Sequence, residues 1–130
     1  MAQKKFKLSL LPKKFAICHL GKSNSIPSWL SIEKDFVSIT RTENELSIVC
    51  PEDQIQGGVL AEKNWRVFKI EGSLGFVLTG IVAGLSRPLA EANISILYIS
   101  SYETDHIMVE EKNLVKTIEI LNNFCEIKKE

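Results

Sequence analysis

The sequence predicts an α+β fold in which two β-α-β-β-α-β units share antiparallel sheets, the first unit with its helices reduced to a turn or a loop. Three observations support this fold class. The chain has 130 residues, which suffices for two small halves that share a sheet but could not each bury a sufficient core alone. Short segments rich in β-branched residues recur along the whole chain and are typical of strands. In the second half, apolar residues also recur at three- and four-residue spacing, which is typical of amphipathic helices.

The first half is predicted to consist of strands joined by loops. Its third and fourth strands are separated only by Glu43-Asn44, so they predict a hairpin. Between the second and third strands, Ile26–Leu30 predicts a short helical turn with Pro27 at its first position, where the missing amide proton costs nothing. Trp29 is expected to anchor this turn in the core. The four predicted strands are Phe6–Leu11, Phe15–Leu20, Phe36–Thr42 and Glu45–Cys50.

The second half predicts the complete β-α-β-β-α-β order, which is the ferredoxin-like order. Its first strand and helix are joined by a glycine-containing turn, Glu71–Gly75. The segment Glu52–Asn64, which contains Gly57-Gly58, is the expected boundary, so the domains are predicted as residues 1–62 and 63–130. The predicted elements are a strand at Trp65–Ile70, a helix from about Leu74 to Glu91, strands at Ile94–Ser100 and His106–Val109, a helix from Leu114 to Leu121 and a closing strand at Phe124–Ile127. The apolar face of the first helix is predicted to consist of Leu78, Ile81, Val82, Leu85, Leu89 and Ala92.

Charge and hydropathy disfavour several classes of partner. Sixteen basic and sixteen acidic residues give a net charge of zero, so we expect no nucleic-acid partner. No apolar run approaches the roughly 20 residues of a spanning helix, so we expect no membrane partner. An interrupted apolar run after the first lysines argues against a secretory signal, so a cytoplasmic protein is expected. The cysteines Cys18, Cys50 and Cys125 lack metal or redox spacing and are expected to be reduced and buried.

Catalytic residues are not expected. The two histidines, His19 and His106, come with neither a nucleophile motif nor metal-ligand spacing, so no metal and no catalytic group are predicted. An enzyme built around Asp105 and His106 is disfavoured because adjacent strand residues point to opposite faces. Gly72-Ser73-Leu74-Gly75 lacks the third glycine of a dinucleotide motif and the lysine of a phosphate-binding loop, so no cofactor is predicted.

Two features nevertheless suggest a small ligand with charges at both ends. Glycines just before a helix let free amide groups face a small carboxylate, although the sequence alone favours a role for Gly72 and Gly75 in a tight strand-to-helix turn. Asp105 can offer its carboxylate to an amino group, although the residue types alone favour a turn in which the side chains of Thr104 and Asp105 bond the local backbone. Together these two ends would recognise an amino acid, and this is the sharper hypothesis.

Several segments resemble a known family. The segments that carry the resemblance are Phe36–Pro51, Trp65-Arg66 with Glu71-Gly72, Pro88–Ala92 with Ile94–Ile96, and Ser100–Asp105. They resemble the small bacterial proteins made of two ACT-like domains, which are similar to the regulatory ACT domains of aspartate kinases and to the CASTOR arginine sensors. The resemblance runs in order from about Phe15 to Leu121.

The resemblance implies a non-catalytic regulatory module that binds a small amino acid at an interface between ACT-like units, commonly as a homodimer. The alternative is a ligand-free structural or protein-interaction module that dimerises through its ACT-like units. The family usually has an aromatic residue after the Thr-Asp pair, where this chain has His106, which leaves the ligand and any pH sensitivity open. The resemblance implies these ligand-binding residues: Ser38, Ile39, Gly72, Ser73, Leu74, Gly75, Phe76, Thr104 and Asp105.

Overall fold

The computed structural model describes residues 6–71 and 80–130. Two compact units are present in the chain. The larger unit comprises Met1–Pro12 and Arg66–Glu130, and the smaller unit comprises Lys13–Trp65. The division into domains at residues 62 and 63 stays a prediction. Neither helix of the described residues has the length and apolar character that crossing a membrane requires.

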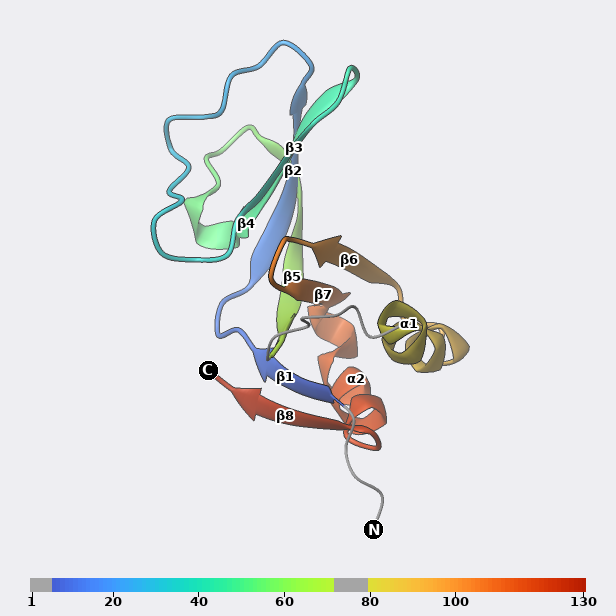
Figure 1. The fold of residues 1–130 in the computed structure, drawn as a ribbon. Coiled ribbons are helices and arrows are strands. Elements are labelled where there is room, and N and C mark those ends of the chain that lie inside the picture. Colours follow the sequence, from blue (N-terminus) through green and yellow to red (C-terminus); the bar gives the residue numbers. More distant parts are fainter. Residues whose placement is uncertain (1–5, 72–79) are drawn as a thin grey trace. The chain divides into compact units, whose positions relative to one another are not determined.

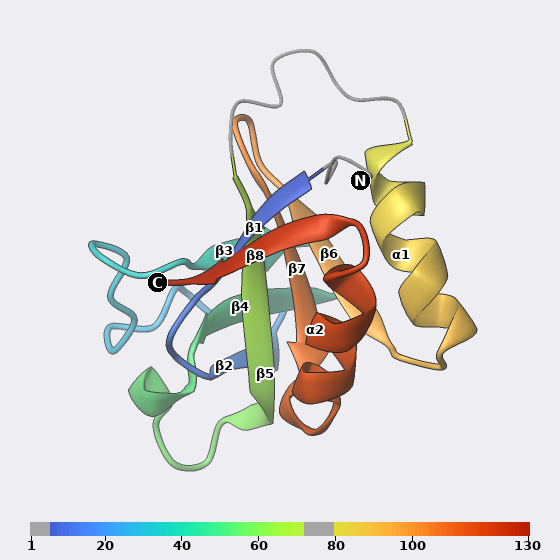
Figure 2. The same ribbon diagram turned by 90° about the horizontal axis from the view of Figure 1, so that it is seen from below.

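The larger unit is a sheet with two helices on one face (Figures 1 and 2). Its strands pair in the order β6-β7-β5-β1-β8, where β5 contributes its second half. The pairing of β1 with β5 is antiparallel and that of β1 with β8 is parallel. The elements are β1 (Phe6–Leu10), β5 (Leu60–Ile70), α1 (Ile81–Glu91), β6 (Ile96–Ser100), β7 (Asp105–Glu110), a 3₁₀ turn η2 (Glu111–Asn113), α2 (Leu114–Leu121) and β8 (Cys125–Lys129).

One apolar cluster holds this sheet to its helices. Alternate residues of the strands, such as Leu8 and Ile70, pack against Leu85 and Leu89 of α1 and Leu121 of α2, and all five are buried. Burying side chains of this size stabilises the unit by roughly 1.5–3 kcal/mol each relative to an exposed position. The element order β5-α1-β6-β7-α2-β8 confirms the predicted β-α-β-β-α-β order.

The smaller unit is a sheet with the strand order β3-β4-β2-β5, where β5 contributes its first half. Its β3–β4 hairpin has the predicted antiparallel pairing. One face packs around Cys18, Leu46, Ile48 and Cys50, with Trp29 among the partly buried residues against them. Besides the first half of β5, the elements of this unit are β2 (Phe15–Gly21), β3 (Ser38–Arg41), β4 (Glu45–Pro51) and a 3₁₀ turn η1 (Glu52–Gln54).

The structure corrects the expectations from the sequence at three places. Ile26–Leu30 forms an isolated turn, closed by a hydrogen bond from the Leu30 amide to the Pro27 carbonyl at 3.2 Å, in place of the predicted short helical turn. Strand β5 begins at Leu60 rather than Trp65. Helix α1 begins at Ile81, after Gly80 with a left-handed φ of 83°, and the earlier part of the helix predicted from Leu74, including Leu78, lies outside the described residues. Val82 is 45% exposed rather than part of the buried helix face.

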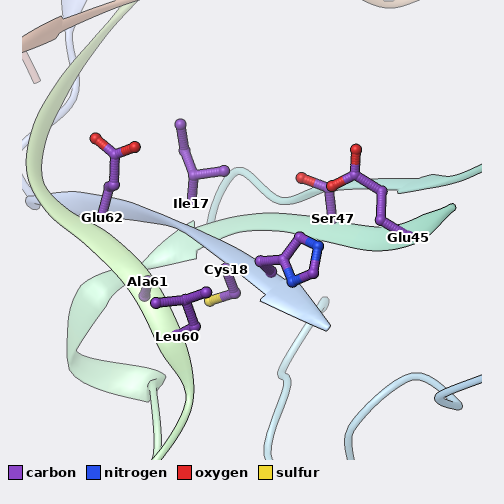
Figure 3. Close-up of a pocket in the computed structure, with 8 residues that line it drawn as sticks. Ile17, Cys18, Glu45, Ser47, Leu60, Ala61 and Glu62 are labelled. Carbon is purple, nitrogen blue, oxygen red and sulfur yellow. The ribbon is translucent and has the colours of Figure 1, made fainter. Parts of the chain in front are cut away.

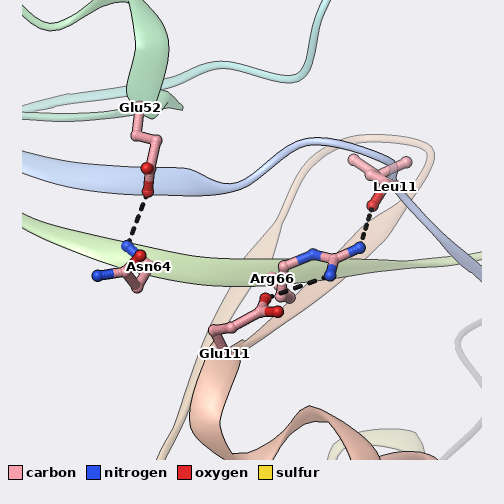
Figure 4. A network of polar contacts seen from close by, with 5 residues as sticks. All are labelled: Leu11, Glu52, Asn64, Arg66 and Glu111. Atoms are coloured by element: carbon pink, nitrogen blue, oxygen red, sulfur yellow. Dashed lines mark hydrogen bonds and ion pairs between the residues drawn. The ribbon is translucent and has the colours of Figure 1, made fainter.

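Hydrogen bonds at residues 64 and 66 fix the middle of β5 within each unit (Figure 4). In the smaller unit, Asn64 has a left-handed φ of 67°, and its amide donates to Glu52 Oε1 at 2.8 Å. In the larger unit, Arg66 donates to Glu111 Oε2 at 3.2 Å and to the Leu11 carbonyl at 3.3 Å. The irregular backbone at Asn64 interrupts the alternation of side chains, which explains why the sequence pattern missed the first half of this strand.

Candidate functional site

A buried carboxylate lies at the start of β7 in the larger unit. The β6–β7 register pairs Ser100 with Asp105 and Tyr98 with Ile107, so Tyr98 and Asp105 lie diagonally on one face of the hairpin. The Tyr98 hydroxyl donates to Asp105 Oδ2 at 2.8 Å, and Asp105 is only 8% exposed. Burial raises the pKa of Tyr98, and the bond to Asp105 raises it further, so the phenol remains a donor at neutral pH.

The turn before Asp105 is held by its own backbone. The amide of Ser101 donates to the Thr104 carbonyl at 2.9 Å, and the Ser101 hydroxyl donates to the same oxygen at 2.7 Å. One of the two roles predicted for Thr104 and Asp105 is that their side chains cap this turn by bonding its backbone. The side chain that caps the turn in the structure is the Ser101 hydroxyl. The Asp105 side chain bonds Tyr98 instead, so it is positioned toward the helix-covered face.

His106 lies on the opposite face of β7 from Asp105, because side chains alternate along a strand and Ile107 and Val109 belong to the helix-covered core. Burial lowers the pKa of His106 to about 4, and the charge of Lys69 contributes, whereas Asp105 acts in the opposite direction. The imidazole is therefore neutral at pH 7. This geometry confirms the expectation that the two adjacent side chains point away from each other.

The other predicted ligand-binding residues fall into two groups. Ser38 and Ile39 lie in β3 of the smaller unit, where they pair with Val49 and Ile48. The predicted residues of the strand-to-helix segment, Gly72, Ser73, Leu74, Gly75 and Phe76, lie outside the described residues. The structure thus brings Ser38 and Ile39 together in one unit and Thr104 and Asp105 together in the other.

Sequence reasoning missed two polar contacts of the larger unit. The first is the Tyr98 partner of Asp105, which the pairing of the β6–β7 hairpin could have indicated. The second is Glu71, which accepts a hydrogen bond from the buried Ser9 hydroxyl and lies 4.0 Å from Lys69 Nζ and 3.9 Å from Lys128 Nζ. The Ser9 bond, followed by these two charges, lowers the pKa of Glu71. A single serine in an apolar strand gives no signal for this contact.

The described part of the chain offers little for redox or metal chemistry. Within residues 6–71 and 80–130, no group of three or more histidine, cysteine or acidic side chains is placed to hold a metal ion. Cys18, Cys50 and Cys125 are all buried. Burial raises the pKa of Cys50 to about 12, which disfavours the reactive thiolate. What the observed site can do chemically is to accept hydrogen bonds at a buried carboxylate.

Comparisons with known proteins identify the family. The family model described as the ACT domain matches residues 60–123, and a second model, described as an N-terminal domain, matches residues 13–57. The mouse (Mus musculus) protein named cytosolic arginine sensor for mTORC1 subunit 1 is 36% identical over 102 residues, which cover 77% of this chain and 30% of that protein. The chain therefore spans less than a third of the length of this curated relative.

Solved structures agree with this assignment. A crystal structure of a protein from Agobacterium tumefaciens is 38% identical, covers 97% of this chain and 94% of its own, and has a TM-score of 0.91. The ligand-free regulatory subunit of aspartate kinase from Thermus thermophilus has a TM-score of 0.62 over 95% of this chain and 99% of its own, and at 12% identity this likeness shows the fold alone. The ACT-domain model that matches residues 60–123, the 36% identical curated relative and the observed β-α-β-β-α-β unit show that the chain belongs to the ACT-domain family.

Proposed function

We propose that this chain is a non-catalytic regulatory module that binds a small amino acid at an interface between ACT-like units and acts as a homodimer in the cytoplasm. The observation that carries this proposal is the carboxylate of Asp105. It is 8% exposed and accepts a hydrogen bond from Tyr98, but it takes part in none of the ion pairs among residues 6–71 and 80–130. A buried carboxylate without a cation is costly, and a ligand's ammonium group would supply that cation.

The relatives suggest which amino acids to test first. One curated relative is named as an arginine sensor, so arginine is the first candidate. The other amino acids complete the panel. The proposed site comprises Ser38, Ile39, Gly72, Ser73, Leu74, Gly75, Phe76, Thr104 and Asp105.

Regulation would follow from differential binding. An amino acid that binds one assembly or conformation more tightly than another shifts the population toward it, by as much as the difference in binding free energy. In this proposal Asp105 fixes the amino group of the ligand, and Tyr98 holds the carboxylate in one orientation. No bond is made or broken, so the ligand leaves unchanged.

Thermal unfolding against a panel of amino acids tests the proposal. A ligand at 100 times its dissociation constant should stabilise the native state by about 2.7 kcal/mol. Asp105→Asn should abolish that shift, because the side-chain amide keeps an oxygen for the Tyr98 hydroxyl but loses the charge that holds the ammonium. For the same reason its unliganded melting temperature should stay close to that of the unchanged protein.

A matched control lies two residues away. Glu103 is exposed in the turn, so Glu103→Gln removes the same charge without touching the buried carboxylate and should keep the full ligand shift. A panel without any response would contradict the proposal. If no amino acid shifts the melting temperature and sedimentation shows a dimer, the result would support the ligand-free interaction module.

A further inference from the structure

A second candidate site lies wholly within the smaller unit. It is a pocket of about 280 Å³ on β2, β4 and β5, lined mainly by side chains of the sheet face that does not carry the Cys18–Ile48 core. Strand register explains its position: Ile17 pairs with Glu62, and His19 pairs with Leu60 on one side and Ser47 on the other. These side chains project from three neighbouring strands to the same face.

The pocket has an apolar floor and acidic ends. Ile17 and Leu60 supply the apolar surface, and Leu60 is 71% exposed although it is a leucine. Figure 3 shows Glu62 at one end and Glu45 beside Ser47 at the other, with their carboxylates extending to the same side of the sheet. No lysine or arginine lines the pocket, and neither carboxylate makes an ion pair or side-chain hydrogen bond with another described residue.

The distance between Glu45 and Glu62 determines which ligands can contact both carboxylates. Glu62 pairs with Ile17, and Glu45 pairs with Gly21, four residues further along β2. The two glutamates are therefore separated by two inter-strand spacings across the sheet and by four residues along the strands. This places their Cα atoms about 17 Å apart. A glutamate side chain reaches only a few ångströms, so one ammonium group cannot pair closely with both carboxylates. A ligand that uses both ends must therefore carry two separated positive charges joined by a chain that can lie on Ile17 and Leu60.

We propose that this pocket binds a linear aliphatic polyamine, with one terminal ammonium at Glu45, the other at Glu62 and the alkyl chain over Ile17 and Leu60. The side chains of Ser47 and His19 can form hydrogen bonds with the ligand along its length. The site is distinct from the amino-acid site proposed above, since none of its lining residues belongs to that set. Its exposed ion pairs predict modest affinity and strong dependence on ligand length.

Isothermal titration of the full chain with three probes tests this assignment. Spermidine, which is long enough to reach both ends, should bind at least fivefold more tightly than ethylenediamine, which is too short, or butylamine, which has one charge. Glu45→Gln and Glu62→Gln should each weaken spermidine binding by about two- to fivefold, as expected for exposed ion pairs. Glu43→Gln is the matched control, since Glu43 is an exposed glutamate of the same hairpin outside the pocket.

Three results would overturn the proposal. They are a lack of saturable spermidine binding, equal affinity for ethylenediamine and spermidine, and equal weakening by Glu43→Gln and Glu62→Gln. A polar surface substitution at these positions should leave the fold intact, and circular dichroism of each variant checks this. A negative result with polyamines would leave the Asp105 proposal unaffected, because the Asp105→Asn test measures thermal shifts caused by amino acids.

Discussion

Thr117 in α2 offers a prediction of increased stability. Its side chain is fully buried, and its hydroxyl has no hydrogen-bond partner among the described residues. A buried hydroxyl left unsatisfied costs about 1–3 kcal/mol. Thr117→Val replaces that hydroxyl by a methyl group of nearly the same shape, with a similar helix propensity. We expect the free energy of unfolding to rise by about 1–2 kcal/mol, after allowance for imperfect packing of the new methyl group.

Urea unfolding at one fixed protein concentration measures this change, and calorimetry should show a melting temperature higher by about 3–8 °C. Thr117→Ser is the matched control, because it keeps the hydroxyl and removes the methyl group. It should lower the stability by about 1 kcal/mol. If Thr117→Val were neutral or destabilising while Thr117→Ser behaved as expected, the hydroxyl would have to be satisfied in solution, for example by the carbonyl of the preceding helical turn, and the reasoning would be refuted.

Two further predictions concern titration and backbone conformation. The pKa of His106 is lowered from 6.5 to about 4 on folding, so between these pH values the unfolded chain binds one proton more than the folded chain. The free energy of unfolding should therefore decrease by about 3 kcal/mol as the pH falls from 6.5 to 4. His106→Gln should flatten this slope in urea unfolding across that range, and an unchanged slope would assign it to other groups. Gly58 and Gly57 both have open space where a Cβ atom would lie, but only Gly58 has a left-handed φ, of 88°. Gly58→Ala should therefore lower the free energy of unfolding, measured in urea, by about 1 kcal/mol, whereas Gly57→Ala should change it little. Equal effects of the two substitutions would mean that the backbone of Gly58 relaxes freely.

The sequence predicts best those elements whose residues obey a single local pattern. Helix α2 has the predicted bounds, Leu114–Leu121, and the hairpin around Glu43-Asn44 pairs as expected, because periodicity and turn chemistry are both readable over a few residues. Val82 shows the limit of such patterns. It follows Ile81 directly, and two adjacent helix residues differ by about 100° around the axis, so a helix that directs Ile81 at the sheet turns Val82 to the edge of its buried face. The sheet buries Ile81 and leaves Val82 in solvent.

Other features depend on residues that are distant in the sequence. Strand β5 begins at Leu60 because its first half pairs with β2, and the left-handed Asn64 hides this continuity from any alternation test. The N-terminal strand β1 joins β5 and β8 rather than its neighbour β2, a pairing decided by long-range contacts and not by local propensity. The class of fold follows from the order of elements, whereas the strand order follows only from tertiary structure.

The candidate site shows the same division between local and long-range information. The residue types of Thr104 and Asp105 are compatible with two roles, a turn capped by their side chains or a carboxylate of Asp105 that binds a ligand. No local rule decides between these roles. The choice depends on Tyr98, seven residues earlier, which the hairpin register brings to within 2.8 Å of Asp105, and on the Ser101 hydroxyl, which caps the turn instead. Since the turn is already closed without the Asp105 side chain, the carboxylate is not needed as a cap. Asp105 forms no ion pair with another residue of 6–71 and 80–130, and in the proposed function the ammonium group of the ligand would fill that role.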